Sequence, residues 1–262
     1  MYTPESSFDD PGYCIEYGKK VSNFADQSGP EVFGRVSFSS ALQHSINAVF
    51  CDIGKRLGAK RVIDEAKDFG FYEQPPIELP SSSVEASGEF NFAKHELFDD
   101  PGLMDPGRLA FGQDKLLVTP LQMALVAAAV ANGGTIMEPH LVDKVTSPGG
   151  GTVVKFKPHV WKHAMKPSSA AALNQMMQAV VTGGTGTSAQ IPGVKVAGKT
   201  GTAETGLDRV YDAWFIFFAP ADNPTVAGAV VVEHSANGFG GSVSAPIAKQ
   251  LMQAILPGAA KK

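Results

Sequence analysis

The sequence predicts an α+β fold in which helices and strands occupy separate parts of the chain. Three strand-like segments follow one another at residues 194–204, 211–219 and 225–234, and only short turns separate them. Short connections favour antiparallel pairing. An amphipathic segment at residues 244–256 follows the strands, so we expect a closing helix that packs on an antiparallel sheet.

Composition limits the classes of function. The chain has 262 residues with 44% apolar content, which is enough for one substantial core. Its formal net charge is −4 and it has no basic stripe, so we do not expect nucleic-acid binding. No stretch approaches the ~20 apolar residues of a membrane span. The first fifteen residues lack the pattern of a signal peptide, so the sequence itself carries neither anchor nor signal.

The remaining elements are predicted from breakers and periodicity. Residues 1–13 are expected to be a loop, because Pro4 and the Asp10-Pro11-Gly12 turn interrupt regular structure. Apolar residues at helical spacing predict one helix over residues 37–58. The elements expected after it are a helix at about 60–69, a surface excursion at 72–108, a helix from Pro120 to about Asn132, short strands and turns at 135–166, and a helix at 167–182.

The cysteines and histidines give no strong signal. Cys14 and Cys51 do not form a disulfide framework or a metal-binding Cys-x-x-Cys, so two free thiols are the preferred interpretation and a bridge between them is the alternative. His159 and His163 are four residues apart, which would suit zinc on a helix. Pro158 and the lack of a third ligand nearby favour surface histidines instead, and we predict no metal site.

The strongest chemical signal lies in the first predicted strand. Gly198 and Gly201 leave the backbone open to a ligand, and Lys199, Thr200 and Thr202 supply a cation and two hydroxyls. Such a strand suits an extended substrate that ends in a carboxylate. The alternative is an edge strand whose polar groups are simply solvated.

A second motif makes the first more specific. Ser45-Ile46-Asn47 alone would be a solvated helix face, but together with Lys199-Thr200-Gly201 it matches two of the three motifs of penicillin-recognising serine acyl-transferases. The chain resembles the transpeptidase domain of class B penicillin-binding proteins over about residues 3–256. Further segments that resemble this family are Phe111-Gly112-Gln113, Thr119-Pro120-Leu121-Gln122, Asn132-Gly133-Gly134, Gly184-Thr185-Gly186 and Ala213-Trp214-Phe215.

The resemblance implies a fold and a set of roles. The fold would be that of penicillin-binding transpeptidases and serine β-lactamases, with an all-helical lobe at about 37–134 and the sheet with its closing helix at about 190–257. Ser45 would relay a proton toward the leaving group, and Asn47 would bind the substrate amide and the activating lysine. Lys199 would support this network.

The resemblance also implies how substrate is held. Thr200 and Thr202 would bind the terminal carboxylate, and Gly201 between them would also belong to the substrate-binding residues. The Thr202 amide would supply half of an oxyanion hole. No cofactor is implied. The implied partners are D-Ala-D-Ala stem peptides of peptidoglycan, β-lactams and a membrane glycan polymerase, at the extracytoplasmic face of the bacterial membrane.

The family's first motif, Ser-x-x-Lys, does not occur in the sequence. No lysine has a serine three positions before it, and the segment from Thr152 to Lys155 is the nearest imitation. In the family this motif precedes a segment like Tyr2-Thr3-Pro4, so we expect an N-terminally truncated domain that does not acylate by itself.

Two other interpretations remain. The chain could be a non-catalytic binding module that keeps the penicillin fold, and upstream sequence would separate this from a fragment. It could also be a relative of β-lactamases or penicillin sensors, although the Thr-Pro-Leu-Gln segment and the excursion at 72–108 fit these less well.

Overall fold

A three-stranded antiparallel sheet lies at the centre of the computed structural model, which describes residues 2–26 and 29–256. Its strands are β14 (Ala197–Glu204), β15 (Val210–Ala219) and β16 (Val226–Ala236), in that order, and both pairs are antiparallel. The predicted sheet is therefore confirmed. Within this sheet β14 is an edge strand.

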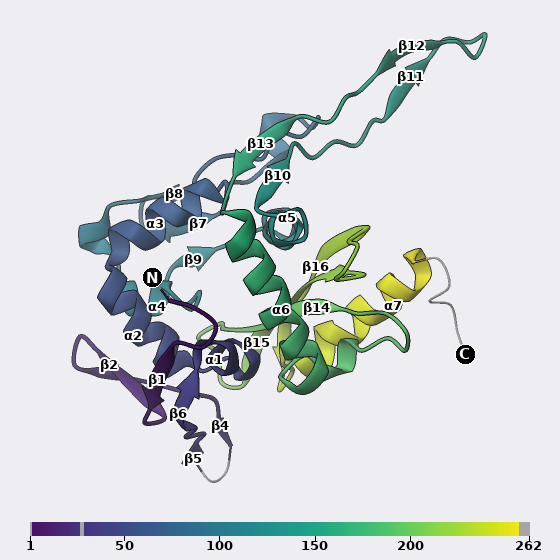
Figure 1. The fold of residues 1–262 in the computed structure, drawn as a ribbon. Coiled ribbons are helices and arrows are strands. Elements are labelled where there is room, and N and C mark those ends of the chain that lie inside the picture. The colour runs from purple at the N-terminus through teal and green to yellow at the C-terminus, as the bar shows by residue number, and fades with distance from the viewer. Residues whose placement is uncertain (1, 27–28, 257–262) are drawn as a thin grey trace.

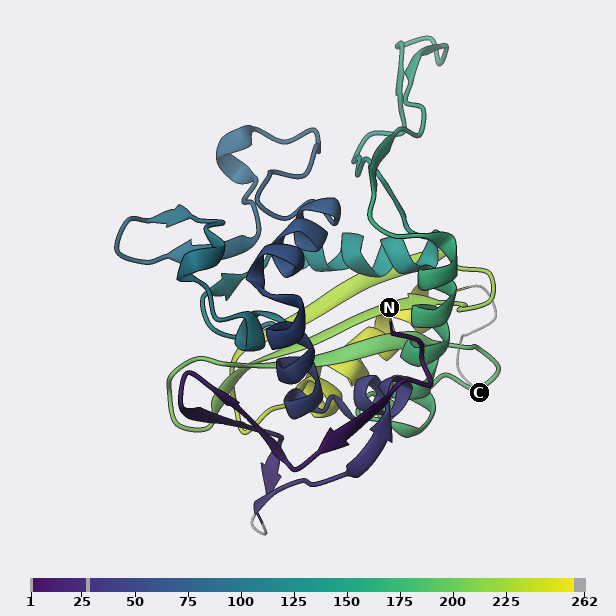
Figure 2. The same cartoon turned by 60° about the vertical axis from the view of Figure 1, so that its left-hand side comes forward.

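Helices cover both faces of the sheet (Figure 2). Alternate residues of β15 point to opposite faces, as the period of a strand requires. Phe215 and Phe217 pack against α7 (Ala245–Ile255), and this confirms the predicted closing helix. Phe218, on the opposite face, packs in one cluster with residues of α5 (Pro120–Ala131) and α6 (Pro167–Gly183).

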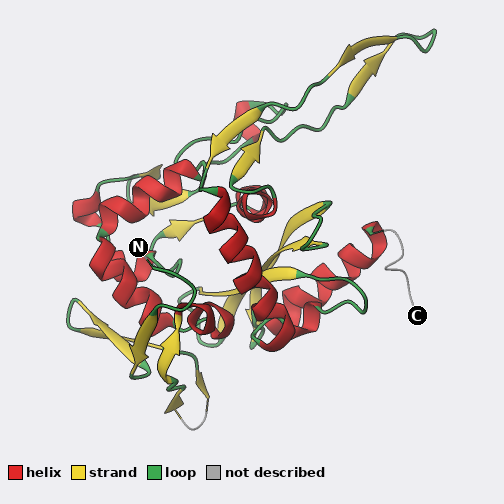
Figure 3. Ribbon diagram, in the orientation of Figure 1, coloured by secondary structure: helices red, strands yellow, loops and turns green. Residues whose placement is uncertain are grey.

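The chain before the sheet forms a second group of helices with strands beside them (Figures 1 and 3). The helices are α1 (Phe38–His44), α2 (Asn47–Leu57) and α3 (Ala59–Asp68). The strands are β1 (Ser7–Asp10), β2 (Tyr13–Glu16), β3 (Lys19–Ser22), β4 (Ala25–Asp26), β5 (Gly29–Pro30) and β6 (Gly34–Ser37). Their pairs are β1 with β6, β2 with β3 and β4 with β5, all antiparallel.

Two sequence predictions were wrong in this region. Residues 1–13 are not all loop, because β1 pairs with β6, a partner that lies too far along the chain for local turn signals to reveal. The helix predicted over residues 37–58 is interrupted between α1 and α2. Ser45 takes a left-handed φ of 57° and Ile46 is extended, while the apolar periodicity continues on both sides of the break.

The lobe predicted to be all-helical contains a small sheet. Strand β7 (Gly88–Asn91) pairs with β8 (Glu96–Leu97) and β9 (Leu116–Leu117). Between them lie the short helices η2 (Pro101–Leu103) and α4 (Pro106–Leu109), and η1 (Ser81–Ser83) precedes them. The excursion at 72–108 therefore has regular structure that its mixed composition did not indicate.

A long hairpin projects from the end of α5 (Figure 1). It consists of β10 (Thr135–Met137), β11 (Lys144–Thr146), β12 (Thr152–Lys155) and β13 (Val160–His163). His159 and His163 are exposed on this hairpin and do not lie on a helix.

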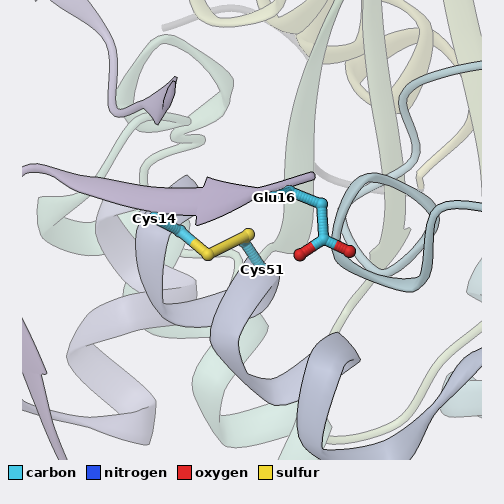
Figure 4. A group of neighbouring side chains, drawn as sticks. All are labelled: Cys14, Glu16 and Cys51. Carbon is cyan, nitrogen blue, oxygen red and sulfur yellow. A yellow bond between two sulfur atoms is a disulfide. The ribbon is translucent and has the colours of Figure 1, made fainter. Parts of the chain in front are cut away.

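Cys14 and Cys51 are joined in a disulfide, so the preference for free thiols was wrong (Figure 4). The hairpin of β2 and β3 packs on α2, and this contact brings together two cysteines 37 residues apart. The nearby Glu16 completes a cluster of potential metal ligands, but the two sulfurs are bonded to each other. A disulfide is typical of proteins that fold in oxidising compartments.

Within residues 2–26 and 29–256, no helix is both long enough and apolar enough to cross a membrane.

Candidate active site

The edge strand β14 holds the predicted Lys199-Thr200-Gly201 motif. Lys199 lies opposite Ile216 in the register of β14 with β15. Gly198 is required just before it, because a Cβ there would approach the ring of Phe215 to 2.4 Å. The fold thus excludes a side chain at this point and leaves backbone beside the lysine.

Lys199 reaches the Ser-x-Asn segment across 154 residues of chain. Its Nζ donates to Ser45 Oγ at 2.7 Å and to the carbonyl oxygen of Thr200 at 2.9 Å. Ser45 is the last residue of the turn that ends α1, where its amide donates to the carbonyl oxygen of Leu42. The left-handed conformation at Ser45 is uncommon for a residue with a Cβ, and such strained residues cluster at functional sites.

Burial controls the charge of this lysine. Lys199 keeps intermediate exposure as a residue, but its amine is surrounded by protein atoms, and this burial lowers its pKa to about 8. None of the ion pairs within the described ranges includes Lys199. An amine with such a pKa exchanges a proton near neutral pH far more readily than an ordinary lysine does.

Asn47 has a different partner from Ser45. It is the first residue of α2, and its side-chain amide donates to the backbone carbonyl of Ser22 at 3.1 Å. Ser45 and Lys199 are thus in direct contact, whereas the Asn47 amide is held by the end of the β2–β3 hairpin.

The hydroxyls of the motif have partners from other segments. Thr200 Oγ1 lies 2.7 Å from Thr185 Oγ1, which belongs to the loop after α6. Thr202 Oγ1 accepts from the amide of Gly240 at 3.4 Å, and Gly240 begins the helix η4 (Gly240–Ser244). The Gln113 side chain donates to the carbonyl oxygen of Thr202 at 3.4 Å.

Sequence reasoning did not name Thr185, Gln113 or Gly240 as site residues. Thr185 and Gln113 stand in the Gly-Thr-Gly and Phe-Gly-Gln segments, so those motifs were the available signal. Gly240 had no comparable signal, because its role depends on how η4 lies against β14.

The arrangement has two chemical capabilities. Lys199 and Ser45 form a short path along which a proton can move. Thr200, Thr202 and the exposed backbone of an edge strand offer hydroxyl and amide groups to an anionic, extended ligand. An α+β domain in which a Ser-x-Asn helix break contacts a Lys-Thr-Gly edge strand defines the class of penicillin-recognising serine acyl-transferases.

The comparison with known families agrees with this class. The profile of the family "Penicillin binding protein transpeptidase domain" matches residues 1–253, so the chain belongs to this family.

Curated relatives are class B penicillin-binding proteins. The chain is 34% identical over 229 residues to the peptidoglycan D,D-transpeptidase PbpA of Mycobacterium tuberculosis, covering 85% of the chain and 44% of PbpA. It is 33% identical to the stage V sporulation protein D of Bacillus subtilis, covering 86% of the chain and 34% of that protein. The chain therefore spans less than half the length of these relatives.

Solved structures share the fold. Penicillin-binding protein A from M. tuberculosis, as its ceftriaxone acyl-enzyme complex, matches with a TM-score of 0.83 and 31% identity, covering 97% of this chain and 56% of that one. The D,D-transpeptidase domain of a peptidoglycan glycosyltransferase from Eggerthella lenta matches with a TM-score of 0.81 and 30% identity, covering 97% and 60%.

Proposed function

We propose that this chain supplies most of the substrate site of a class B D,D-transpeptidase that cross-links peptidoglycan. The observation that carries the proposal is the 2.7 Å contact between Lys199 Nζ and Ser45 Oγ, because it unites two motifs that are far apart in sequence. The family membership and the relatives named PbpA support the reaction class.

The substrate is a stem peptide that ends in D-Ala-D-Ala. It would add to the free edge of β14 at Gly201, and Thr200 and Thr202 would hold its terminal carboxylate. Asn47 would bind the peptide amide. β-Lactams would enter the same site, as the acyl-enzyme complexes of the M. tuberculosis relative suggest.

Acyl transfer requires a nucleophile. The serine hydroxyl gives its proton to its activating base, and its Oγ forms an ester with the penultimate D-Ala carbonyl. The bond to the last D-Ala nitrogen breaks, and Ser45 with Lys199 passes a proton to that leaving nitrogen. The amine of a second stem peptide then attacks the ester and takes the acyl group, and the proton it loses returns to the serine oxygen. Since the 262 residues contain no Ser-x-x-Lys, we propose that the nucleophile comes from a segment outside this sequence and that the chain binds ligand without acylating.

The disulfide supports a location outside the cytoplasm. Cys14 and Cys51 would stay oxidised at the extracytoplasmic face of the bacterial membrane, where the whole protein would work with a membrane glycan polymerase.

Labelling with a fluorescent penicillin tests this function. The chain by itself is expected to form no covalent adduct, and a chain extended by a segment with Ser-x-x-Lys is expected to label. Lys199→Ala should weaken labelling of the extended chain, while the exposed Lys195→Ala serves as the matched control. An adduct on the unextended chain would show that its own serine is the nucleophile.

Titration with a labelled D-Ala-D-Ala peptide separates a transpeptidase site from a scaffold. We expect chemical-shift changes at Thr200 and Thr202 with the D,D-peptide but not with its L-Ala-L-Ala counterpart. A chain that responds to neither peptide, even when extended by Ser-x-x-Lys, would instead fit a module that has lost the substrate site.

A further inference from the structure

A buried polar pair lies directly behind the helix break that carries Ser45 and Asn47. Its members are Asp10, at the end of β1, and Asn23, just after β3. Asp10 is 2% exposed and Asn23 is 5% exposed. Both Asp10 oxygens accept from Asn23 Nδ2, at 3.0 and 2.9 Å. A buried polar pair of this kind is costly to leave half-satisfied, so each of its polar atoms is expected to have a partner.

Backbone amides fix the orientation of Asp10. Its Oδ1 accepts from the amide of Gly12 at 2.8 Å, and its Oδ2 accepts from the amide of Phe33 at 2.9 Å. Asn23 Nδ2 also donates to the carbonyl oxygen of Glu31 at 3.0 Å. The side-chain nitrogen Nδ2 of Asn23 therefore points toward Asp10, and the side-chain oxygen Oδ1 of Asn23 points toward α2.

Asn23 Oδ1 accepts from the backbone amide of Ala48 at 2.9 Å. Ala48 is the second residue of α2, the position whose amide a capping side chain normally satisfies. The residue that should do so locally is Ile46, whose apolar side chain makes no cap hydrogen bond. Asn23 therefore caps α2 from 25 residues earlier in the chain.

The neighbouring backbone holds the next residue of the site. Ser22, adjacent to Asn23, accepts the side-chain amide of Asn47 at 3.1 Å. Ser22 and Asn23, at the end of β3, therefore hydrogen-bond to the first two residues of α2. Ser45 lies on the other side of the helix break, in its left-handed conformation. That conformation is uncommon for a residue with a Cβ, so the surrounding contacts must hold it in place.

We propose that Asn23, oriented by Asp10, is a positioning residue that sets where α2 begins and thereby holds Ser45 against Lys199. The inference deepens the proposed function, because it takes Ser45, Asn47 and Lys199 as the site. Asparagine suits the position because its amide offers a donor to Asp10 and an acceptor to Ala48 at once. Neither alanine nor aspartate does so at neutral pH.

The test uses the chain by itself and a readout that does not depend on turnover. The ε-carbons of lysine are labelled with ¹³C, and the Lys199 resonance is followed against pH in the wild type, Asn23→Ala and Val21→Ala. Val21 is buried in the same β2–β3 hairpin and has no polar role, so it is the control for general loss of stability. Asn23→Ala is expected to move the Lys199 midpoint upward from about 8 by about one pH unit as water reaches the amine.

The result that overturns the proposal is equally definite. If Asn23→Ala lowers Tm as Val21→Ala does but leaves the Lys199 midpoint and the amide shifts of Ser45 and Asn47 unchanged, Asn23 is structural only. Equal movement of the Lys199 midpoint in both variants would likewise show that Asn23 is structural only. These readouts involve no substrate, so a negative result here would leave the proposed function unaffected. A failure of penicillin labelling would likewise leave the role of Asn23 unaffected.

Asn23→Ser keeps the test decisive if the alanine variant does not fold. A serine hydroxyl can donate to Asp10 and accept from Ala48, but it reaches less far than the asparagine amide, so it cannot hold both partners at their present distances. We expect altered amide shifts for Ser45 and Ala48 and a raised Lys199 midpoint in Asn23→Ser. Wild-type values of all three in this variant contradict the proposal.

Discussion

Ser45 combines a backbone that disfavours its side chain with a hydroxyl that contacts Lys199 in the candidate site. Its φ of 57° would suit glycine, which has no Cβ to clash. The hydroxyl accepts from Lys199, so a glycine would relieve the backbone and lose the contact. The contact with Lys199, and not the backbone conformation, therefore accounts for a serine at this position.

The first prediction separates these two effects. Both Ser45→Ala and Ser45→Gly remove the hydroxyl, but only glycine relieves the left-handed backbone. We expect Ser45→Gly to be more stable than Ser45→Ala by about 1 kcal/mol in urea unfolding. Equal stabilities would show that the left-handed conformation at position 45 carries no cost.

Glu89 of β7 is a buried acid away from the site. It is 1% exposed, and although the backbone amide of Lys115 is near, neither carboxyl oxygen makes a hydrogen bond of normal geometry in the described part of the chain. Burial, and next the charge of Asp114, raise its pKa from 4.5 to about 7. The folded protein therefore keeps this proton more tightly than the unfolded chain does.

The second prediction follows from that difference. Between pH 4.5 and 7 the folded state binds more protons at Glu89, so its contribution to stability is lost as pH rises through this window. Glu89→Gln should remove this slope and gain on the order of 1–3 kcal/mol relative to wild type at pH 8. Denaturant unfolding at pH 4.5, 6 and 8 measures it, with the exposed Glu85→Gln as control. An unchanged slope in Glu89→Gln would assign the pH dependence elsewhere.

At the scale of elements, strands with strong local signals could be predicted and long-range pairs could not. β14, β15 and β16 have alternating or apolar patterns and short turns, so their antiparallel pairing followed from the sequence. β1 pairs with β6, but the four residues of β1 contain no sequence signal that identifies β6 as the partner strand. The break between α1 and α2 was missed because apolar periodicity persists across Ser45 and Ile46, although α2 takes its cap from Asn23.

The helix η4 depends on a close approach to the sheet. A Cβ at Gly240 would lie 2.2 Å from the carbonyl oxygen of Trp214 and 2.5 Å from that of Gly201. Backbone cannot move aside as a flexible side chain can, so η4 would have to shift away from β14.

The third prediction is that Gly240→Ala perturbs the site through this shift. We expect a loss of about 1–3 kcal/mol in stability and altered amide shifts at Thr202, whose hydroxyl accepts from the Gly240 amide. Gly149→Ala is the control, because nothing lies within 4 Å of a Cβ there. If Gly240→Ala is destabilised but keeps wild-type amide shifts at Thr202, the position of η4 does not affect the candidate site.

At the scale of the molecule, the site joins segments from most of the chain. Ser45 and Asn47 come from the helix break, Thr185 from the loop after α6, and Lys199 from the edge strand. The contact between Ser45 and Lys199 was expected because the two motifs make chemical sense only together. The hydrogen bond between the Asn47 side chain and the Ser22 carbonyl oxygen was not expected, because no sequence pattern places Ser22 beside Asn47.

The disulfide between Cys14 and Cys51 ties the β2–β3 hairpin to α2, the helix that carries Asn47. Both cysteines belong to the core cluster of this region, with exposures of 8% and 0%. Closing a loop between residues 37 apart restricts the unfolded chain, and native disulfides of small domains typically contribute about 2–5 kcal/mol. The same bond keeps the hairpin, and so Ser22 and Asn23, in place against α2.

The fourth prediction is that opening this bond lowers both stability and the order of the site. The chain is reduced under mild denaturation and refolded in the presence of reductant, which keeps both thiols free. Its free energy of unfolding should be lower than that of the oxidised chain by about 2–5 kcal/mol. The amide of Ala48 should exchange faster with solvent, because its partner Asn23 lies just beyond the released hairpin. The Cys14→Ser and Cys51→Ser double variant should behave like the reduced chain and should not respond to reductant. If thiol titration shows complete reduction while stability and Ala48 exchange stay at wild-type values, packing alone fixes the hairpin on α2 and the disulfide is dispensable for the site.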